Sequence, residues 1–306
     1  MALLPVYLPL AETAIDGMLL VAIGAGVGLM SGMFGVGGGF LITPMLIFLG
    51  VPPPIAAATG ANTVVASSAA GAIAHWRRGT LDLKMGVLLL LGGLVGSGAS
   101  VWLFGWLARL GQIDLVVALC YVLLLGSVGI LMLAESLREL VAKPVRAAAP
   151  KPRGRWLRSL PWQVRFPKSG IETSALAPLV LGMFIGVLTG LMGVGGGFLL
   201  VPAMIYLIGM PTVMTVGTSL LQIAIVGSAV TFLQATTNQT VDIMLALILI
   251  LGGVVGAQIG AVFAGKLRGD QIRILLGLIV LAVGLAVAVD LVLPPADLYI
   301  LTPVAD

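Results

Sequence analysis

The sequence predicts an all-α polytopic membrane protein made of two homologous halves. Composition, the length of the apolar segments and an internal repeat all indicate this class. Of the 306 residues, 59% are hydrophobic and only 9% are charged, and the mean hydropathy is +1.17. A soluble protein of this size needs a charged surface, whereas a surface that faces lipid must be apolar.

Continuous apolar runs, rather than alternating patterns, predict helices, and a membrane-crossing helix needs ~20 residues. Two shorter apolar pieces, at about residues 40–50 and 198–209, are too short to cross comfortably at ~1.5 Å per residue, so we expect half-helices there. The full-length segments are expected at about residues 17–33, 55–75, 85–107, 114–134, 175–192, 212–233, 243–265 and 274–293.

The segments divide the chain into three parts. We expect a first transmembrane repeat at residues 1–134, a basic cytoplasmic linker at 135–174 and a second transmembrane repeat at 175–306. The linker contains several prolines and most of the positive charge of the chain, which is typical of a solvated loop. Alternatively, its aromatic residues could lie on anionic lipid beside the basic side chains. These aromatic residues are Trp156, Trp162 and Phe166.

The two halves are copies of one another. Residues 28–49 align with residues 186–207 at a constant offset of 158, and 12 of the 22 positions are identical, including the stretch GVGGGFL. Further along, LGGLVG at 91–96 matches LGGVVG at 251–256. Internal repeats in a membrane protein predict a transporter whose substrate site lies where corresponding broken helices meet.

The repeated pattern G-x-x-x-G-x-x-G-V-G-G-G-F-x-x-x-P, together with TVGTSL at 215–220 and the weaker AATGAN at 57–62, resembles the sulfite exporter TauE/SafE family of anion permeases. The resemblance spans both halves. It implies an inner-membrane carrier of small anions, often sulfur oxyanions or organosulfonates such as sulfite or sulfoacetate. The first half reads TGAN where the second reads GTSL, so we expect the polar site to be asymmetric.

The distribution of Lys and Arg favours inverted over parallel repeats, because cytoplasmic loops are enriched in both residues. If the second half is inverted, 15 of the 16 Lys and Arg residues lie inside, whereas parallel halves leave 12 inside. The difference comes from Lys266, Arg268 and Arg273. We therefore expect an inverted repeat, with parallel halves as the alternative.

Inversion makes residues 17–50 and 175–210 re-entrant hairpins that enter from opposite faces. Helices that resume at Phe40 and Phe198 would aim unpaired N–H groups and positive dipole ends at the hairpin tips, which suits an anion. Glycine also allows the positive φ angles that amide nests require. The alternative is that these glycines only permit close helix packing, which we expect for Gly92 and Gly96. The tip residues that we expect to bind substrate are Gly37, Gly38, Gly39, Phe40, Gly195, Gly196, Gly197 and Phe198.

Uncharged polar side chains within the helices supply further donors for an oxyanion. The substrate-binding candidates are Thr59, Asn62, Thr218, Ser219 and Gln222, of which Thr59 and Thr218 correspond in the repeat. The alternative is that such side chains bond the carbonyl groups of their own helix.

His75 is the only histidine of the chain. Histidine titrates near neutral pH, so His75 is a candidate for carrying a coupling proton. The alternative is an interfacial anchor beside the neighbouring tryptophan.

The predicted function is a multi-pass secondary transporter of a small anion in the cell inner membrane. An anion channel, or an importer of another small organic acid, is the alternative. Enzymatic activity is not expected, because the chain has one histidine, one cysteine and no HExxH motif. We expect no cofactor and no metal. The expected partners are the substrate anion and the lipid bilayer rather than nucleic acid. A homodimer is a further possibility.

Overall fold

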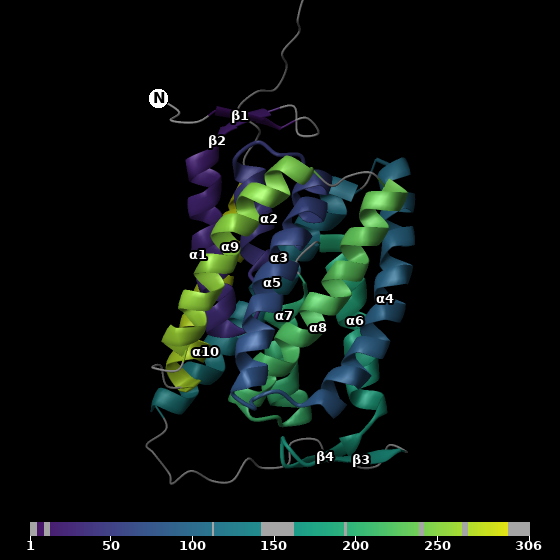
Figure 1. Ribbon diagram of the computed structural model, residues 1–306, viewed down its shortest axis with the longest axis vertical. Coiled ribbons are helices and arrows are strands. Elements are labelled where there is room, and N and C mark those ends of the chain that lie inside the picture. Colours follow the sequence, from purple (N-terminus) through teal and green to yellow (C-terminus); the bar gives the residue numbers. More distant parts are fainter. Residues whose placement is uncertain are drawn as a thin grey trace, which may run out of the picture.

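The computed structural model describes residues 5–8, 13–111, 113–141, 162–192, 195–238, 242–264 and 269–292. The described chain is mainly α-helical, and its helices follow the apolar segments of the sequence (Figure 1). The all-α polytopic fold class is confirmed. Of the three residues that distinguish the inverted from the parallel arrangement, Lys266 and Arg268 lie outside the described part.

The first half contains five helices, of which the second is short. They are α1 (Gly17–Phe34), α2 (Gly39–Phe48), α3 (Pro53–Arg77), α4 (Leu83–Arg109) and α5 (Ile113–Val141). Helix α5 therefore continues beyond the expected linker boundary at residue 134.

The second half repeats this order of long and short helices. Two π-helical turns, η1 and η2, extend α7 and α8. The elements are α6 (Leu176–Met192), α7 (Gly197–Ala203), η1 (Met204–Ile208), α8 (Thr212–Leu233), η2 (Gln234–Asn238), α9 (Ile243–Ala264) and α10 (Gly269–Val292).

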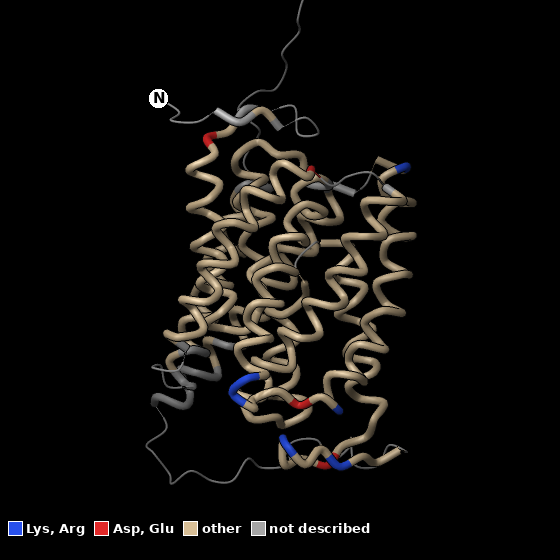
Figure 2. Tube along the Cα trace, viewed as in Figure 1, with Lys and Arg blue, Asp and Glu red and all other residues tan. Residues whose placement is uncertain are grey.

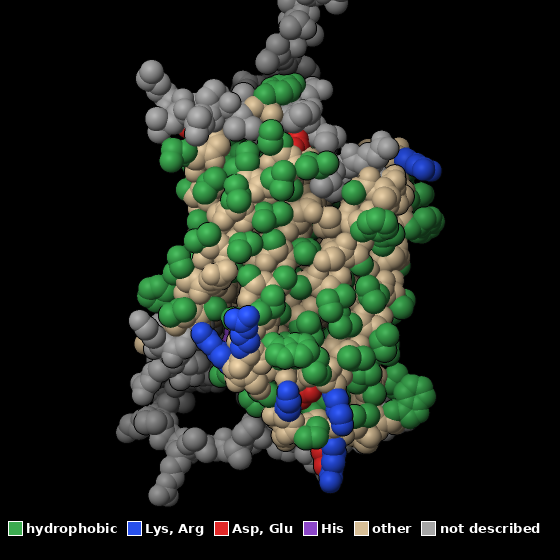
Figure 3. All heavy atoms as spheres, viewed as in Figure 1, with side chains coloured by type: hydrophobic (Ala, Val, Ile, Leu, Met, Phe, Trp, Pro, Cys, Tyr) green, Lys and Arg blue, Asp and Glu red, His purple; other side chains and the backbone are tan. Residues whose placement is uncertain are grey.

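The side of the bundle is apolar. Among the described residues, four helical stretches are long and apolar enough to cross a membrane, and shorter apolar helices accompany them. On the face shown, hydrophobic side chains cover the lateral surface, while Lys and Arg gather mostly at the lower end (Figure 3). This distribution identifies a multi-pass membrane protein.

The helix pairs follow the repeat. Helix α1 packs along α9, α4 along α6, α3 along α8 and α5 along α10. Exchanging the two halves converts the first pair into the second and leaves the other two pairs unchanged. Glycines permit the closest approaches: a Cβ atom at Gly92 or Gly96 of α4 would overlap a carbonyl oxygen of α6. This agrees with the packing role expected for both glycines.

Two β-hairpins, which the sequence did not predict, lie at opposite ends of the molecule (Figure 1). Strands β1 (Pro5–Leu8) and β2 (Thr13–Asp16) lie where α1 begins, and β3 (Gln163–Phe166) and β4 (Ile171–Ser174) lie where α6 begins. Helices α1 and α6 therefore enter from opposite ends, and α2 and α7 run back toward those ends. This placement supports the inverted repeat, whose orientation in a bilayer stays a prediction.

Basic residues lie mainly at the end that carries β3 and β4, whereas Arg109 ends α4 at the other end (Figure 2). The β3–β4 hairpin corrects the expectation of a wholly solvated linker. Phe166 is only 1% exposed and belongs to a buried cluster that includes Met85 and Met204, and Ser169 Oγ donates to Asp82 Oδ2 at 2.6 Å. This part of the linker is fixed by one buried aromatic ring and one buried hydrogen bond. Trp156 and the rest of residues 142–161 lie outside the described residues.

Candidate functional site

Each triple glycine turns the chain at a hairpin tip and starts a new helix. Gly37 and Gly38 have φ angles of 81° and 75°, and Gly195 and Gly196 have φ angles of 71° and 65°. Side chains are disfavoured in this left-handed region, which explains why these positions are glycine. Gly38 and Gly196 are the N-caps of α2 and α7, and neither start has a side-chain cap. The first N–H groups of both helices therefore lack the usual capping acceptor.

The two tips meet on the same pair of side chains. A Cβ atom at Gly37 would lie 2.9 Å from Val64 Cγ1 and 3.1 Å from Ile223 Cγ2, and one at Gly195 would lie 2.6 Å and 2.7 Å from the same two atoms. Val64 belongs to α3 and Ile223 to α8. A Cβ atom at Gly197 would overlap the carbonyl oxygen of Val36, so the tips also touch one another.

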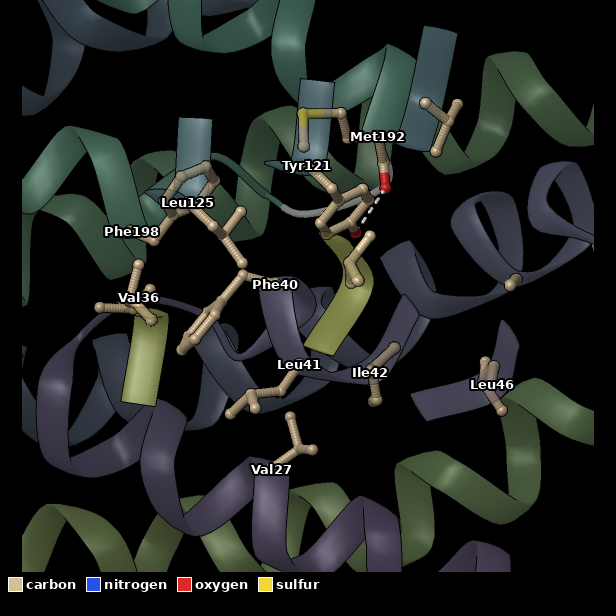
Figure 4. Packing of buried hydrophobic residues seen from close by; sticks show 14 of the residues in the cluster. Val27, Val36, Phe40, Leu41, Ile42, Leu46, Tyr121, Leu125, Met192 and Phe198 are labelled. Carbon is tan, nitrogen blue, oxygen red and sulfur yellow. Dashed lines mark hydrogen bonds between the residues drawn. The ribbon is translucent and has the colours of Figure 1, made fainter. Parts of the chain in front are cut away.

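The aromatic rings that follow the glycines pack together. The ring centroids of Phe40 and Phe198 are 6.1 Å apart with an interplanar angle of 39°, and both side chains are buried. Val36 lies beside both rings (Figure 4). Nearby, Tyr121 Oη of α5 donates to the carbonyl of Met192 at 3.1 Å and holds the end of α6. The starts of α2 and α7 are therefore fixed against one another by apolar contacts.

Serine hydroxyls of the central helices bind the carbonyl groups of the first tip. Ser219 Oγ of α8 donates to the Gly35 carbonyl at 2.8 Å, and Ser67 Oγ of α3 lies 3.4 Å from the Gly37 carbonyl. Ser31 Oγ of α1 lies 3.4 Å from Ser67 Oγ. All three serines are buried. Binding the carbonyl oxygens keeps this tip oriented.

Thr59 and Thr218 make matching hydrogen bonds away from the tips. Thr218 Oγ1 accepts the Asp82 N–H at 3.1 Å, and Thr59 Oγ1 accepts the Asp242 N–H at 3.0 Å. Each aspartate in turn caps the helix that follows it, α4 or α9, through its carboxylate. The structure thus uses both threonines to join the central helices to the starts of α4 and α9.

Several buried polar side chains of the central helices α3 and α8 have unpaired atoms. Gln222 is 0% exposed, and neither its Nε2 nor its Oε1 has a hydrogen-bond partner; the hydroxyls of Thr63 and Ser68 are also unpaired. Ser68 Oγ lies 3.1 Å from the position of a Cβ atom on Gly37. Asn62, by contrast, donates to the Ala58 carbonyl of its own helix at 3.4 Å.

His75 lies at the end of α3, away from the tips. It is 6% exposed, its Nδ1 lies 2.8 Å from Thr80 Oγ1, and its Nε2 has no partner. Thr80 Oγ1 also lies 3.2 Å from the His75 carbonyl, so its hydroxyl can donate to this carbonyl or to Nδ1, depending on the tautomer of the ring. The ring is therefore a buried group rather than an exposed interfacial anchor.

The tips combine backbone N–H groups, hydroxyls and one amide, all uncharged. Such donors can bind an anion without a buried Lys or Arg. Among the described residues, no group of three or more His, Cys, Asp or Glu side chains could hold a metal ion.

Val64, Ile223 and Thr63 were missed by sequence reasoning. The repeat register could have identified them, because the offset of 159 that relates Thr59 to Thr218 also relates Val64 to Ile223 and Thr63 to Gln222.

Comparison with known proteins gives one consistent result. The family model described as sulfite exporter TauE/SafE matches residues 20–287. A probable membrane transporter protein of Xylella fastidiosa is 33% identical over 277 residues, which are 88% of this chain and 94% of the relative. The probable membrane transporter protein YjnA of Bacillus subtilis is 28% identical over 269 residues, or 87% of this chain and 97% of the relative.

No solved structure matches this chain. A shorter match covers 68 residues, or 21% of this chain and 15% of the relative, and is 37% identical to the sulfite exporter TauE/SafE family protein 1 of Arabidopsis thaliana. Because the family model covers most of the chain, including both glycine tips, the chain belongs to the TauE/SafE sulfite exporter family, a family of membrane transporters.

Proposed function

We propose that this protein is a secondary transporter of a small anion, a sulfur oxyanion or an organosulfonate such as sulfite or sulfoacetate. The observation that carries the proposal is the meeting of two helix starts: Gly37 and Gly195 pack on the same two side chains, Val64 and Ile223. Two helix N-termini that converge from opposite ends place partial positive charge and N–H donors at one point. The family to which the chain belongs supports the sulfur-containing class.

The proposed site consists of the two tips and the unpaired polar groups beside them. Gly38 and Gly196 supply the turn, and Ser68 and Gln222 supply a hydroxyl and an amide. Burying unpaired polar groups costs free energy unless a partner completes their hydrogen bonds. An oxyanion that binds both N-termini is such a partner. We do not include Thr59 and Thr218, because their oxygens already accept backbone N–H groups.

We also propose the inverted arrangement of the repeats and residence in a cell inner membrane. Alternating access then follows from movement of one half against the other around the fixed tips. Cysteine labelling tests the inversion, with Cys120→Ala as the background. Cysteines at Arg109 of the first half and Thr237 of the second should react with an impermeant reagent from the same side of the membrane, whereas parallel halves would place them on opposite sides.

Transport by the purified protein in liposomes tests the function. The panel of anions is sulfite, thiosulfate, sulfoacetate, taurine and a simple carboxylate. A carrier gives saturable uptake and counterflow, whereas a channel gives large unitary currents. The expected result is saturable flux of at least one sulfur-containing anion and no flux of the carboxylate. Failure of every sulfur-containing anion would overturn the proposal.

A further inference from the structure

Among the described residues, Gln222 is the side chain that has two buried polar atoms without a hydrogen-bond partner. It lies in α8, is 0% exposed, and both its Nε2 and its Oε1 lack a hydrogen-bond partner. The next residue, Ile223, packs on Gly37 and Gly195. Gln222 therefore lies within one turn of the side chain that touches both tips, and its amide lies beside Gly93 of α4.

Space for this amide comes from a glycine of the neighbouring helix. A Cβ atom at Gly93 of α4 would lie 3.0 Å from Gln222 Nε2. At the matching place in the other half, a Cβ atom at Gly253 of α9 would lie 2.9 Å from Thr63 Cγ2. Both halves thus place a buried polar side chain against a glycine. The first half supplies a hydroxyl where the second supplies an amide, so the two sides of the site differ chemically.

An unpaired amide has a requirement that a hydroxyl does not have. A hydroxyl can rotate to serve either as donor or as acceptor, but an amide presents an N–H₂ donor and a C=O acceptor at the same time. A fully deprotonated oxyanion offers only acceptors, so it would satisfy Nε2 and leave Oε1 unpaired at a cost in free energy. A ligand that satisfies both atoms must carry a donor of its own.

We infer that Gln222 selects anions that carry their own O–H or N–H donor, such as a protonated oxyanion or a sulfonate with a hydroxyl or ammonium group. This inference rests on the proposed function. The tip N–H groups bind the anionic oxygens, and Oε1 of Gln222 accepts the donor of the ligand. Sites built to hydrogen-bond a substrate hydroxyl reject the analogue that lacks it far more strongly than apolar pockets reject a missing methylene.

Two sulfonates of nearly equal size test the inference. Hydroxyethanesulfonate and propanesulfonate differ in that a terminal hydroxyl replaces a terminal methyl group. Their dissociation constants are measured by calorimetry on the purified full-length protein, with sulfite as a third ligand. We expect hydroxyethanesulfonate to bind at least about tenfold more tightly, because the analogue leaves a buried acceptor unpaired.

The variant Gln222→Met removes the amide and nearly keeps the volume. It should reduce the affinity ratio of the two sulfonates to about one, chiefly by weakening the hydroxylated ligand. The matched control is Gln234→Met, which alters a second buried glutamine whose Nε2 already donates to the Gly190 carbonyl at 3.1 Å. This control should keep the wild-type ratio. Elution as a single symmetric peak in size-exclusion chromatography identifies folded variants.

The outcomes separate the inference from the proposed function. Equal affinity for the two sulfonates in the wild type, an unchanged ratio in Gln222→Met, or no binding of either sulfonate while sulfite binds would overturn the inference and leave anion binding standing. If sulfite also fails to bind, the proposed function falls with it.

Discussion

Helices α3 and α8 occupy matching places in the two halves, and comparing them residue by residue separates what the repeat keeps from what it changes. Thr59 and Thr218 are identical and make the same bond to an aspartate N–H. Val64 and Ile223 are both β-branched, and each packs against both tips. The scaffold that holds the tips is therefore duplicated.

Other matching positions differ. At equivalent positions of the repeat, the second half has Gln222, Ser219 and Gln234 where the first half has Thr63, Gly60 and His75. Ser219 binds the first tip through Gly35, and a glycine at position 60 cannot return that contact. Gln234 donates to the Gly190 carbonyl, whereas Nε2 of His75 has no partner. The differences lie in polar groups, so the two halves have different chemistry on a common backbone.

The largest effect should follow from adding a methyl group at a tip. In Gly38→Ala, the new Cβ atom would lie 2.5 Å from Val27 Cγ1 and 3.0 Å from the Val27 carbonyl oxygen. We expect transport to fall about a hundredfold, since a displacement of about 1 Å at a binding centre can cost that much. Gly196→Ala should behave in the same way, because its Cβ atom would overlap Ile185.

Gly50→Ala and Gly209→Ala are the matched controls for the tip variants. Both glycines have positive φ, 86° and 82°, but a Cβ atom there meets nothing within 4 Å. They carry the same backbone strain without the overlap and should keep most of the transport. Undiminished flux in Gly38→Ala, with folded protein, would contradict a site at the tips.

The duplicated threonines should matter for stability by equal amounts. Thr59→Val and Thr218→Val each leave a buried aspartate N–H without its acceptor, so each should lower the free energy of unfolding by about 1–3 kcal/mol. Thermal unfolding in detergent measures the loss. Thr63→Val is the control, because its hydroxyl has no partner, and it should unfold at or above the wild-type temperature. If Thr59→Val and Thr218→Val lost very different amounts of unfolding free energy, the equivalent roles that the hydrogen bonds indicate would be contradicted.

Ser219→Ala should have a smaller effect. It removes the bond to the Gly35 carbonyl, and a net contribution of about 1 kcal/mol is typical of such a bond. Because Gly60 offers no counterpart, we expect the first tip alone to loosen, with faster amide hydrogen exchange around Gly37 and unchanged exchange around Gly195. Equal loosening of both tips would show that they are held as one unit.

His75→Gln should change the pH profile of transport and little else. The variant copies the residue that the second half has at this position, so the fold should be kept. In the wild type the single histidine gives one set of ¹⁵N NMR signals, which report the protonation of its ring. The variant should lose the pH dependence of flux that protonation of the His75 ring gives. An unchanged profile would contradict a coupling role for His75.

Local features of the sequence were sufficient to predict the helices. Segment lengths, hydropathy and the constant offset between GVGGG stretches depend only on neighbouring residues and on the repeat. Long-range contacts were not predictable in the same way. Thr59 and Thr218 have hydroxyl groups that could bind a substrate. Their hydrogen-bond partners are instead backbone N–H groups that lie 183 and 136 residues away along the chain. A hydroxyl serves a substrate, its own helix or a distant N–H equally well, so residue type alone did not decide among these roles.

The linker shows the same limit in another way. Its charge and prolines indicate a solvated segment, and they give no sign that Phe166 enters a core beside Met85 or that Ser169 bonds Asp82. Short hairpins of this kind depend on the surface against which they pack.

By itself, the sequence determined that this chain is a duplicated, all-helical membrane protein interrupted by two triple glycines, because hydropathy, helix length and backbone freedom are properties of short segments. Only the tertiary structure decided that the two interruptions meet on Val64 and Ile223 and that Gln222 stays unpaired beside them. Those facts depend on how helices from opposite halves pack. This packing determines which buried polar groups have a hydrogen-bond partner within the protein and which do not.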